Sequence, residues 1–300
     1  TSFKPLAKEM SAERRIIAGH DAEQRIKGSA ADFLEYFRDR FNVLSAIFAK
    51  RRNFSPKSIS KVKAQKDKTD VEFIGMVYKK WKSKNGNYII QVEDLEDGCI
   101  CVVPHGNKRL ADLSKRVLLD DVIGIRGRKI TKDMVAVNDV LWPEMESKPP
   151  KEVERDLSVV SISDMHVGSK LFLEREFERF LAWISGKIGQ QKELERVGKI
   201  KYLVICGDNV DGIGVYPDQY DELAVKGIHE QYKIFSDYIA SIPEYIEIFI
   251  CPGQHDAVRR ADPQPPVPKE FVSGIAGLGN VHLVGSPGWF EIEGLKCLIY

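Results

Sequence analysis

The chain has 300 residues, of which 43% are apolar, and its 45 lysine and arginine side chains almost balance 44 aspartate and glutamate side chains. These values describe a globular protein with enough sequence for two domains. A membrane-spanning helix is excluded because no run of about eighteen apolar residues occurs, and the lack of a charged and apolar leader argues against secretion. Five scattered cysteines are too few for a disulfide framework, which indicates a reducing, cytoplasmic compartment.

Charge is distributed unevenly along the chain. Residues 50–70 carry a net charge of +6, whereas residues 157–300 carry −6. Basic connecting segments often contact phosphate groups, and acidic clusters in folded domains often bind cations. The chain starts at Thr1 rather than methionine, and residues 295–300 have the apolar pattern of a strand. We therefore expect the sequence to be part of a longer protein.

The first 49 residues predict a helical N-terminal segment. Ser29 and Asp32 are candidate helix caps, and an apolar stripe follows at steps of three and four residues: Leu34, Phe37, Phe41, Leu44 and Phe48. This pattern indicates a helix that packs against other structure and carries no chemistry. Residues 50–70 are polar, basic and without periodicity, so we expect them to form a linker.

Residues 71–142 predict a small β-barrel. We expect a hairpin turn at Asn85-Gly86, a short helix at 108–117, and strands at 71–81, 88–92, 98–103, 122–128 and 134–140. Five strands with a helix between the third and the fourth are the order of an OB fold. Cys99 and Cys101 share one face of a strand and have no second cysteine pair, so we interpret them as core residues.

OB folds often bind single-stranded nucleic acid through basic and aromatic side chains. The candidates on this barrel lie near the first hairpin and on the fourth strand: Lys80, Trp81, Lys82, Arg126 and Arg128. The alternative is a barrel that docks a partner protein and whose lysines form a solvated face, because the net charge of residues 71–142 is only +2.

Residues 143–156 contain three prolines among alternating charges and predict a second linker. From 157 to 300 buried strands alternate with amphipathic helices, which is typical of an α/β layered domain. Strands are expected at 157–162, 202–206 and 246–251, with helices near 174–186 and 227–240 and further strands towards residue 300. Ligands of such domains bind beyond the carboxyl ends of the parallel strands.

Each of these three strands is followed at once by residues that can bind metals or transfer protons. Asp164-Met165-His166 follows the first strand, Gly207-Asp208-Asn209-Val210-Asp211 the second, and Gly253-Gln254-His255-Asp256 the third. One such pair alone is more often a structural hydrogen-bonded pair. Three at consecutive strand ends predict one site for two divalent cations, and two cations about 3.5–4 Å apart suit the hydrolysis of phosphate esters.

These motifs resemble D-x-H, G-D-x-x-D and G-N-H-D/E of the calcineurin-like metallophosphoesterase superfamily. The form Asp164 to Gly168 is more similar to the DNA nucleases of that superfamily than to its protein phosphatases. With an OB domain upstream, residues 71–300 resemble the small subunit of archaeal family D DNA polymerase. The resemblance implies a nucleoid-associated replication protein with 3′→5′ proofreading exonuclease activity, whose partners are single-stranded 3′ ends of DNA and the large catalytic subunit.

The resemblance also implies the metal ligands. Asp164 and His166 would hold the first metal, and Asp208 would bridge both. Gln254 stands where the family has a second-metal asparagine, and it keeps the amide oxygen on a side chain that is one methylene longer. The likeness to nucleases implies manganese, although histidine and carboxylate ligands also admit iron or zinc.

His255 would, by the same resemblance, stabilise the transition state or protonate the leaving oxygen, with Asp256 orienting it. The family's remaining ligands, a histidine and a Gly-His-x-His motif, are expected beyond residue 300. The alternative function is a scaffold, as in eukaryotic replicative polymerase B-subunits, which share the architecture but have lost the ligands. The enzyme is favoured because a decayed site should not retain all five of its residues together, namely Asp164, His166, Asp208, His255 and Asp256.

Overall fold

The computed structural model describes residues 3–18, 28–144, 147 and 149–300. The chain divides into two compact units, Ile26–Pro149 on the one hand and Thr1–Arg25 with Pro150–Tyr300 on the other. Parts of the expected helical segment 1–49 and of the expected linker 143–156 lie outside the described residues. In the described part of the chain, no helix is long and apolar enough to span a membrane.

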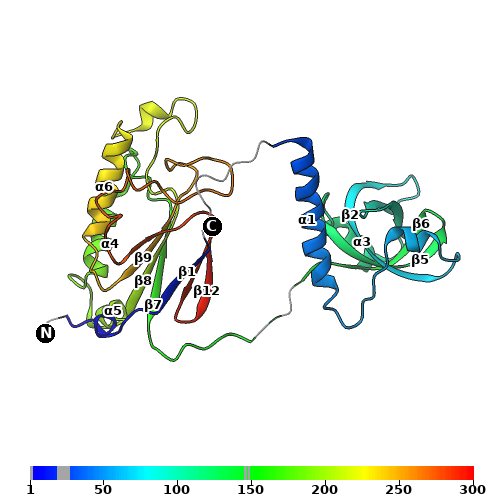
Figure 1. Ribbon diagram of the computed structural model, residues 1–300, viewed down its shortest axis with the longest axis horizontal. Helices are drawn as coiled ribbons and strands as arrows, with labels where there is room; N and C mark the ends of the chain where they lie inside the picture. The colour runs from blue at the N-terminus through cyan, green and yellow to red at the C-terminus, as the bar shows by residue number, and fades with distance from the viewer. Residues whose placement is uncertain (1–2, 19–27, 145–146, 148) are drawn as a thin grey trace. The chain divides into compact units, whose positions relative to one another are not determined.

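The smaller unit is built on a closed five-stranded barrel, and the expected OB fold is confirmed (Figure 1). Its strand order is β2-β3-β4-β6-β5, and the short helix α3 (Lys108–Arg116) lies between β4 and β5 in sequence. The strands are β2 (Asp70–Lys82), β3 (Tyr88–Glu93), β4 (Gly98–Val103), β5 (Val122–Thr131) and β6 (Met134–Leu141). Cys99 and Cys101 are buried in the barrel core as free thiols.

Helix α1 (Ala30–Phe48) packs one end against this barrel. Ser29 and Asp32 form a capping box at its start, in which the Ser29 hydroxyl accepts from the Asp32 N–H. Phe41 and Phe48 near its C-terminal end are buried in a cluster with Ile74 of the barrel. The apolar stripe thus marked a packing helix, but only its second half is covered.

The expected linker 50–70 is folded instead. It contains helix α2 (Ile59–Lys63), whose Ile59 and Val62 are fully buried in the barrel core. Lys63 forms ion pairs of 2.8 Å with both Asp97 and Asp133. Two apolar residues three positions apart close one end of the barrel, and part of the positive charge is used inside the unit.

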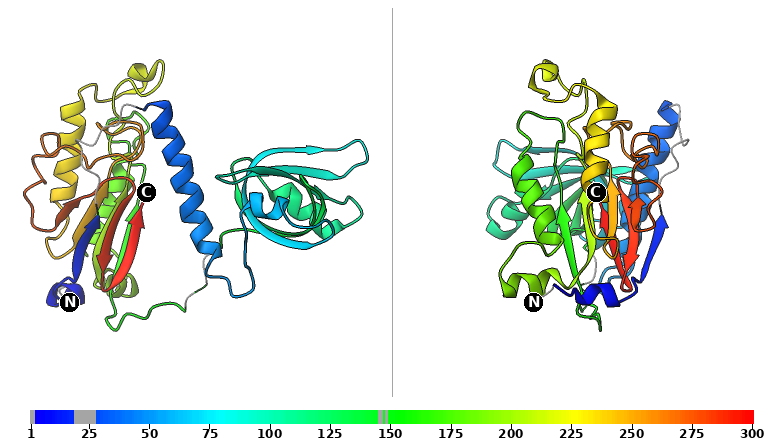
Figure 2. Two further views of the ribbon diagram at one scale, coloured as in Figure 1. Left: turned by 45° about the vertical axis from the view of Figure 1, so that its right-hand side comes forward. Right: turned by 90° about the vertical axis from the view of Figure 1, so that its left-hand side faces the viewer.

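The larger unit contains a four-stranded parallel sheet in the order β10-β9-β8-β7, and helices cover one of its two faces (Figure 2). Its elements are β7 (Ser158–Ile162), α4 (Glu174–Ile184), α5 (Gln191–Val197), β8 (Ile200–Cys206), α6 (Ile228–Ala240), β9 (Glu247–Cys251) and β10 (Val281–Leu283), with 3₁₀ turns η1 (Leu6–Glu9) and η2 (Gln219–Glu222). Helix α5 was not expected from the sequence. The alternation of strand and helix was, and the α/β layered fold is confirmed.

A second sheet packs on the other face and includes a strand from the start of the chain. Its order is β1-β11-β12, with β1 (Arg14–Ala18), β11 (Gly288–Ile292) and β12 (Leu295–Ile299). The first residues therefore form part of the larger unit, and residues 26–149 are inserted between its two segments. This differs from the expected linear order, because the five residues of β1 are too short to give a periodic signal.

Two aromatic rings form the centre of the contact between the sheets. Phe249 of β9 and Phe290 of β11 stack at 4.1 Å between ring centroids, and both are almost fully buried. The neighbouring Trp289 points the other way and is 42% exposed, as expected from the alternation of side chains along a strand. This inter-sheet core fixes the strand β9, whose end carries one of the site loops.

Replacing Phe290 by alanine should lower the free energy of unfolding by about 3–5 kcal/mol, because it leaves a cavity between the two sheets. The matched change Trp289→Ala, one residue away on the opposite face, should cost less than about 1 kcal/mol. Urea unfolding followed by circular dichroism measures both values. Equal effects of the two substitutions would contradict this packing.

Candidate functional site

The carboxyl ends of β7, β8 and β9 meet at one edge of the parallel sheet, and their loops form the candidate site. Asp164, His166 and Asp208 lie in these loops with φ angles of 55°, 48° and 50°. Left-handed backbone is unfavourable for residues other than glycine, and such conformations gather at functional sites. The loops therefore hold these three side chains in positions that relaxed turns would not give.

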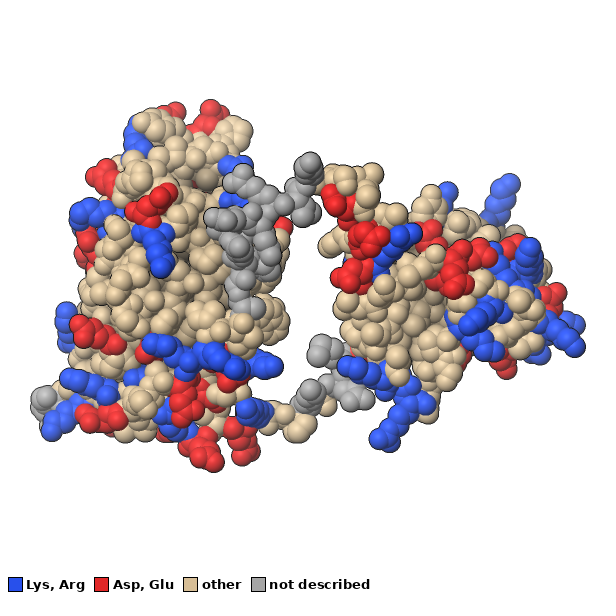
Figure 3. All heavy atoms as spheres, in the orientation of Figure 1, with Lys and Arg blue, Asp and Glu red and all other residues tan. Residues whose placement is uncertain are grey.

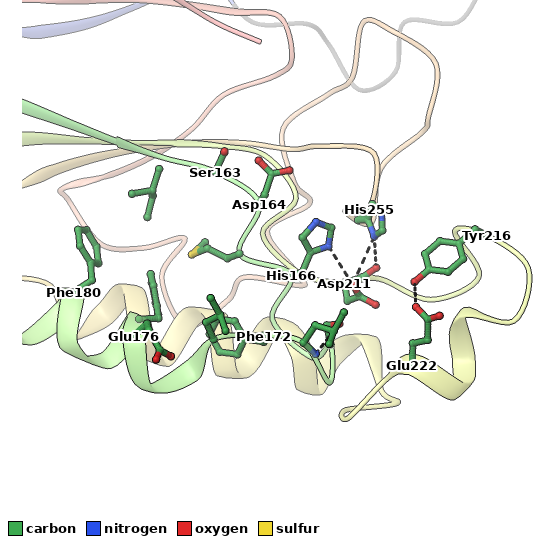
Figure 4. Close-up of a pocket in the computed structure, with 16 residues that line it drawn as sticks. Ser163, Asp164, His166, Phe172, Glu176, Phe180, Asp211, Tyr216, Glu222 and His255 are labelled. Atoms are coloured by element: carbon green, nitrogen blue, oxygen red, sulfur yellow. Dashed lines mark hydrogen bonds and ion pairs between the residues drawn. The ribbon is translucent and has the colours of Figure 1, made fainter.

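Three side chains converge on one point at this edge (Figure 4 labels His166 and His255). The ligand atoms of His166, Asp208 and His255 lie within 4.8 Å of one another, and all three residues are half-buried. His166 Nε2 is 3.8 Å from Asp208 Oδ2, and the two imidazole rings meet edge to face at 4.5 Å. Two imidazoles and a carboxylate are a donor set that suits a divalent transition metal, so the residues present fit a metal ion.

The buried Asp211 fixes both imidazoles. Its Oδ1 is 3.1 Å from His166 Nδ1, and its main-chain carbonyl oxygen is 2.7 Å from His255 Nδ1. Because carboxylate and carbonyl oxygens only accept, Nδ1 is the nitrogen that donates in each ring, and in the neutral ring the lone pair lies on Nε2. A carboxylate that orients a ligand histidine in this way is typical of metal centres.

Gln219 holds Asp211 in place, and sequence reasoning missed it. The Gln219 side-chain amide donates to both the carbonyl oxygen and Oδ2 of Asp211, at 2.7 and 3.0 Å, and it accepts from Val215 N–H. Gln219 is 1% exposed on the turn η2. No sequence motif marks a lone glutamine in a loop, so only the fold identifies this contact.

The loop after β9 fits closely around Asp208. Asp208 Oδ1 accepts from His255 N–H at 2.9 Å. A Cβ atom at position 253 would lie 2.2 Å from the same oxygen, so only glycine leaves room for this carboxylate. Gly253 therefore lets the His255 loop approach Asp208 closely enough to place both in one cluster.

Asp256 forms other contacts than the contact with the His255 ring that its expected role requires. Its carboxylate accepts from Gly253 N–H, from Asn209 N–H and side-chain amide, and from the Tyr232 hydroxyl, at 2.8–3.1 Å. Within the described residues its hydrogen bonds tie the two loops together, and Asp211 rather than Asp256 faces the His255 ring. Burial raises the pKa of Asp256 to about 6, although the hydrogen bonds partly oppose this effect.

Two of the expected metal ligands lie outside the cluster. Asp164 is exposed and lines the same cavity as His166 and His255, but it is not among the three converging residues. Gln254 is exposed at the tip of its loop and does not line that cavity. The cluster instead contains His255, which the sequence marked for proton transfer.

The nucleic-acid candidates on the barrel divide into two groups. Lys80 Nζ donates to the carbonyl oxygens of Ser114 and Lys115 at the end of α3, at 3.2 and 3.4 Å. Arg126 pairs with Glu72 at 2.7 Å, and Arg128 donates to the Lys68 carbonyl oxygen at 2.9 Å. The side chains of these three residues therefore form hydrogen bonds or ion pairs with other residues of the barrel unit.

Trp81 and Lys82 remain accessible. Trp81 is 37% exposed, and the ammonium of Lys79 lies 5.7 Å from its ring centroid. Lys82 lies 5.0 Å from the ring centroid of Tyr88. The first hairpin thus combines exposed lysines with aromatic faces, while the fourth strand contributes less than expected.

Comparisons with known proteins agree with this fold. Residues 157–297 match the family model of calcineurin-like phosphoesterases, so the larger unit contains a domain of this class. The chain is 36% identical over 305 residues to the DNA polymerase II small subunit of Methanocaldococcus jannaschii, covering 99% of this chain and 50% of that protein. The corresponding subunit of Archaeoglobus fulgidus is 38% identical over 286 residues, covering 95% and 56%.

The chain is thus homologous to DNA polymerase II small subunits of archaea, and the expected resemblance is confirmed. A third relative, from Methanothermobacter thermautotrophicus, is 34% identical over 294 residues, covering 97% of this chain and 60% of its own length. The chain therefore spans about half the length of the curated relatives it matches.

The role of Asp211 can be measured without any enzyme assay. Asp211→Ala should weaken Mn²⁺ binding by about 10–100-fold, because the His166 imidazole loses the acceptor that fixes its orientation. Isothermal titration calorimetry of the folded variant measures this change. Asp218→Ala, an exposed carboxylate in the same loop, is the control and should bind as the unchanged chain does. Unaltered affinity in Asp211→Ala would show that the histidines need no such support.

Proposed function

We propose that this chain contributes a metal-dependent phosphodiesterase site, which acts as a 3′→5′ exonuclease on DNA in a polymerase assembly. The observation that carries this proposal is the convergence of His166, Asp208 and His255 at the carboxyl edge of the parallel sheet. The cluster fits divalent metals, of which manganese is our first expectation. The DNA polymerase names of the relatives support DNA as the substrate and a large catalytic subunit as the partner.

The chain's own residues have separate roles in the proposed reaction. His166 and Asp208 would hold metal, and Asp164 at the same rim would join them as a further ligand. Bound divalent ions would activate water and neutralise charge on the phosphoryl oxygens. Water attacks the terminal phosphorus and releases a proton to solvent, and the bond to the 3′ oxygen of the preceding nucleotide breaks. His255 in its imidazolium form, protonated at both ring nitrogens, donates the Nε2 proton to that oxygen. The products are a nucleoside 5′-monophosphate and a shortened strand.

Gln254 and Asp256 would have smaller roles in the proposed site. Gln254 is exposed beside the cluster, and its amide oxygen would have to turn inwards to serve as a ligand of a second metal. Asp256 keeps the loops of Asp208 and His255 together through its buried hydrogen bonds. It is therefore a positioning residue that acts through the backbone of both loops.

A subunit-joining role is the second candidate, and the first half of α1 favours it. Phe33, Leu34, Tyr36 and Phe37 are between 40% and 63% exposed within two helical turns. Leu34 and Phe37 line a groove of about 420 Å³, in which, among the described residues, acidic side chains of the barrel outnumber the one basic side chain, Arg38. Figure 3 shows acidic side chains on the barrel unit beside α1, where they would repel DNA and attract a basic, apolar protein segment.

A nuclease assay separates the two functions. The substrate is a 5′-labelled single-stranded oligonucleotide with Mn²⁺, and the proteins are the full-length parent, its His255→Ala and Asp208→Ala variants, and Asp218→Ala as the control. We expect stepwise shortening from the 3′ end by the parent and by Asp218→Ala. The rate should fall by at least about 100-fold in His255→Ala, because the leaving oxygen is no longer protonated, and in Asp208→Ala, because a metal ligand is lost. Activity retained in Asp208→Ala, or no activity in a parent with bound metal, would contradict the exonuclease.

The joining role has its own measurement. Leu34→Arg should weaken binding of the large polymerase subunit at least about tenfold, because it places a cation in the centre of an apolar contact. Ile130→Arg changes a similarly exposed apolar residue on β5 and serves as the control. Biolayer interferometry with purified large subunit gives both affinities, and equal binding of the two variants would exclude α1 from the interface.

A further inference from the structure

A cavity of about 560 Å³ joins the metal cluster to an aromatic surface (Figure 4). At one end it is lined by Asp164, His166, Asp211 and His255. At the other end it is lined by apolar side chains from β7, the following loop and α4, chiefly Phe172, Phe177 and Phe180. Its size lies within the range of sites for small molecules, so one nucleotide fits it better than a length of duplex.

The apolar end consists of packed aromatic rings with free edges. Phe177 stacks on Phe180 with centroids 5.8 Å apart, and Phe172 lies 6.0 Å from Phe177. Tyr238 of α6 supports both Phe172 and Phe177 from behind, at 6.1 and 5.3 Å. All of these rings are only partly buried. They form a preorganised surface on which a further planar ring can stack.

Two leucines project at the mouth of this surface. Leu171 is 82% exposed and Leu173 is 67% exposed, on either side of Phe172. The loop that carries them is fixed by main-chain hydrogen bonds, from Lys170 N–H to the Glu222 carbonyl oxygen at 3.0 Å and from Phe172 N–H to that of Ser169 at 3.2 Å. A fixed loop that exposes two large apolar side chains within ten residues of a metal cluster indicates contact with a ligand.

The charges along the cavity restrict which part of a nucleotide can enter the apolar end. Among the described residues no lysine or arginine lines the cavity, whereas Glu176 lies at its aromatic end and Glu222 near the cluster. A phosphate group is therefore disfavoured everywhere except beside metal. The aromatic end suits an uncharged planar group, and the Glu176 carboxylate can accept a hydrogen bond from an exocyclic amino group.

We infer that the aromatic end, formed by Phe172 and Phe177 behind the Leu171 rim, binds the unpaired base of the terminal nucleotide. This inference rests on the proposed function, since it places that nucleotide's phosphodiester at the metal cluster. Stacking on aromatic side chains is largely independent of base identity. A base that is paired in a DNA double helix cannot reach the rings. The subsite therefore selects 3′ ends of DNA that are already unpaired or that open easily.

Binding of the base can be tested without cleavage. The probe is a single-stranded oligonucleotide with 2-aminopurine at its 3′ end, joined by a phosphorothioate that resists hydrolysis, in the presence of Ca²⁺. Bound to the full-length parent, this base should be shielded several-fold from quenching by acrylamide. Leu171→Ser and Phe172→Leu should remove the shielding, whereas Leu298→Ser, an exposed leucine on β12, should not. An unshielded base in the bound complex would overturn the inference.

A second measurement uses substrates that differ only in the base. Removing the terminal base should lower kcat/KM of the parent about tenfold or more, because stacking is lost while the phosphodiester remains. In Phe172→Leu the normal and abasic ends should be cleaved at nearly equal rates. Equal rates in the parent would overturn the inference but leave the exonuclease standing.

The two readouts also separate this inference from the function on which it rests. Shielding without any cleavage would keep the base subsite and remove the exonuclease. If instead the three variants bind the probe alike and Leu171→Ser weakens binding of the large subunit, a protein segment occupies the aromatic surface and the subsite is excluded.

Discussion

The site depends on one buried carboxylate more than on any of the residues that would touch a metal. Asp211 is 4% exposed, and it gives His166 its carboxylate oxygen and His255 its main-chain oxygen. These two contacts determine that Nδ1 of each ring donates its proton to Asp211, and so they leave Nε2 free to bind a metal or to take up a further proton. The amide of Gln219 keeps the Asp211 carboxylate in this position. The histidines are thus oriented by residues that contact their rings but would not themselves bind a metal.

A second buried carboxylate holds the strand ends together. Asp256 receives hydrogen bonds from the loop after β8, from its own loop and from Tyr232 of α6. Burial is the largest influence on its pKa, which is raised, so the charged form is costly and is maintained by four donors. The same network leaves Asn209 Oδ1 buried without a partner among the described residues. One buried polar atom is thus left without a hydrogen bond at the point where the two loops meet.

The sequence predicted those features that leave a periodic or local signal. The strand ends followed by Asp208 and His255 were readable because β8 and β9 are buried and apolar. Strand β7 before Asp164 is only partly buried, and its valines and isoleucine gave the signal. The strand β1 was not, since its five residues include two arginines, Arg14 to Ile17 are exposed, and the strand pairs with β11 from the other end of the chain. Lys80 was a candidate for contact with nucleic acid, because its partners in the structure, carbonyl oxygens at the end of α3, leave no pattern in the sequence. Loop geometry also decides that Asp211, and not Asp256, faces the His255 ring, and the sequence gives no signal for this choice.

The insertion of the barrel between β1 and β7 constrains how the two candidate functions relate. Because the larger unit needs β1 to cover β11, the barrel is attached to it at both ends, and neither unit is a removable appendage. The barrel offers an acidic, apolar surface beside α1 and a lysine–aromatic hairpin around Trp81. Charge favours a protein partner for the first surface and nucleic acid for the second. The two proposed contacts, with a partner subunit and with DNA, would therefore use different surfaces of one barrel, and the proposed hydrolysis at the sheet edge is compatible with both.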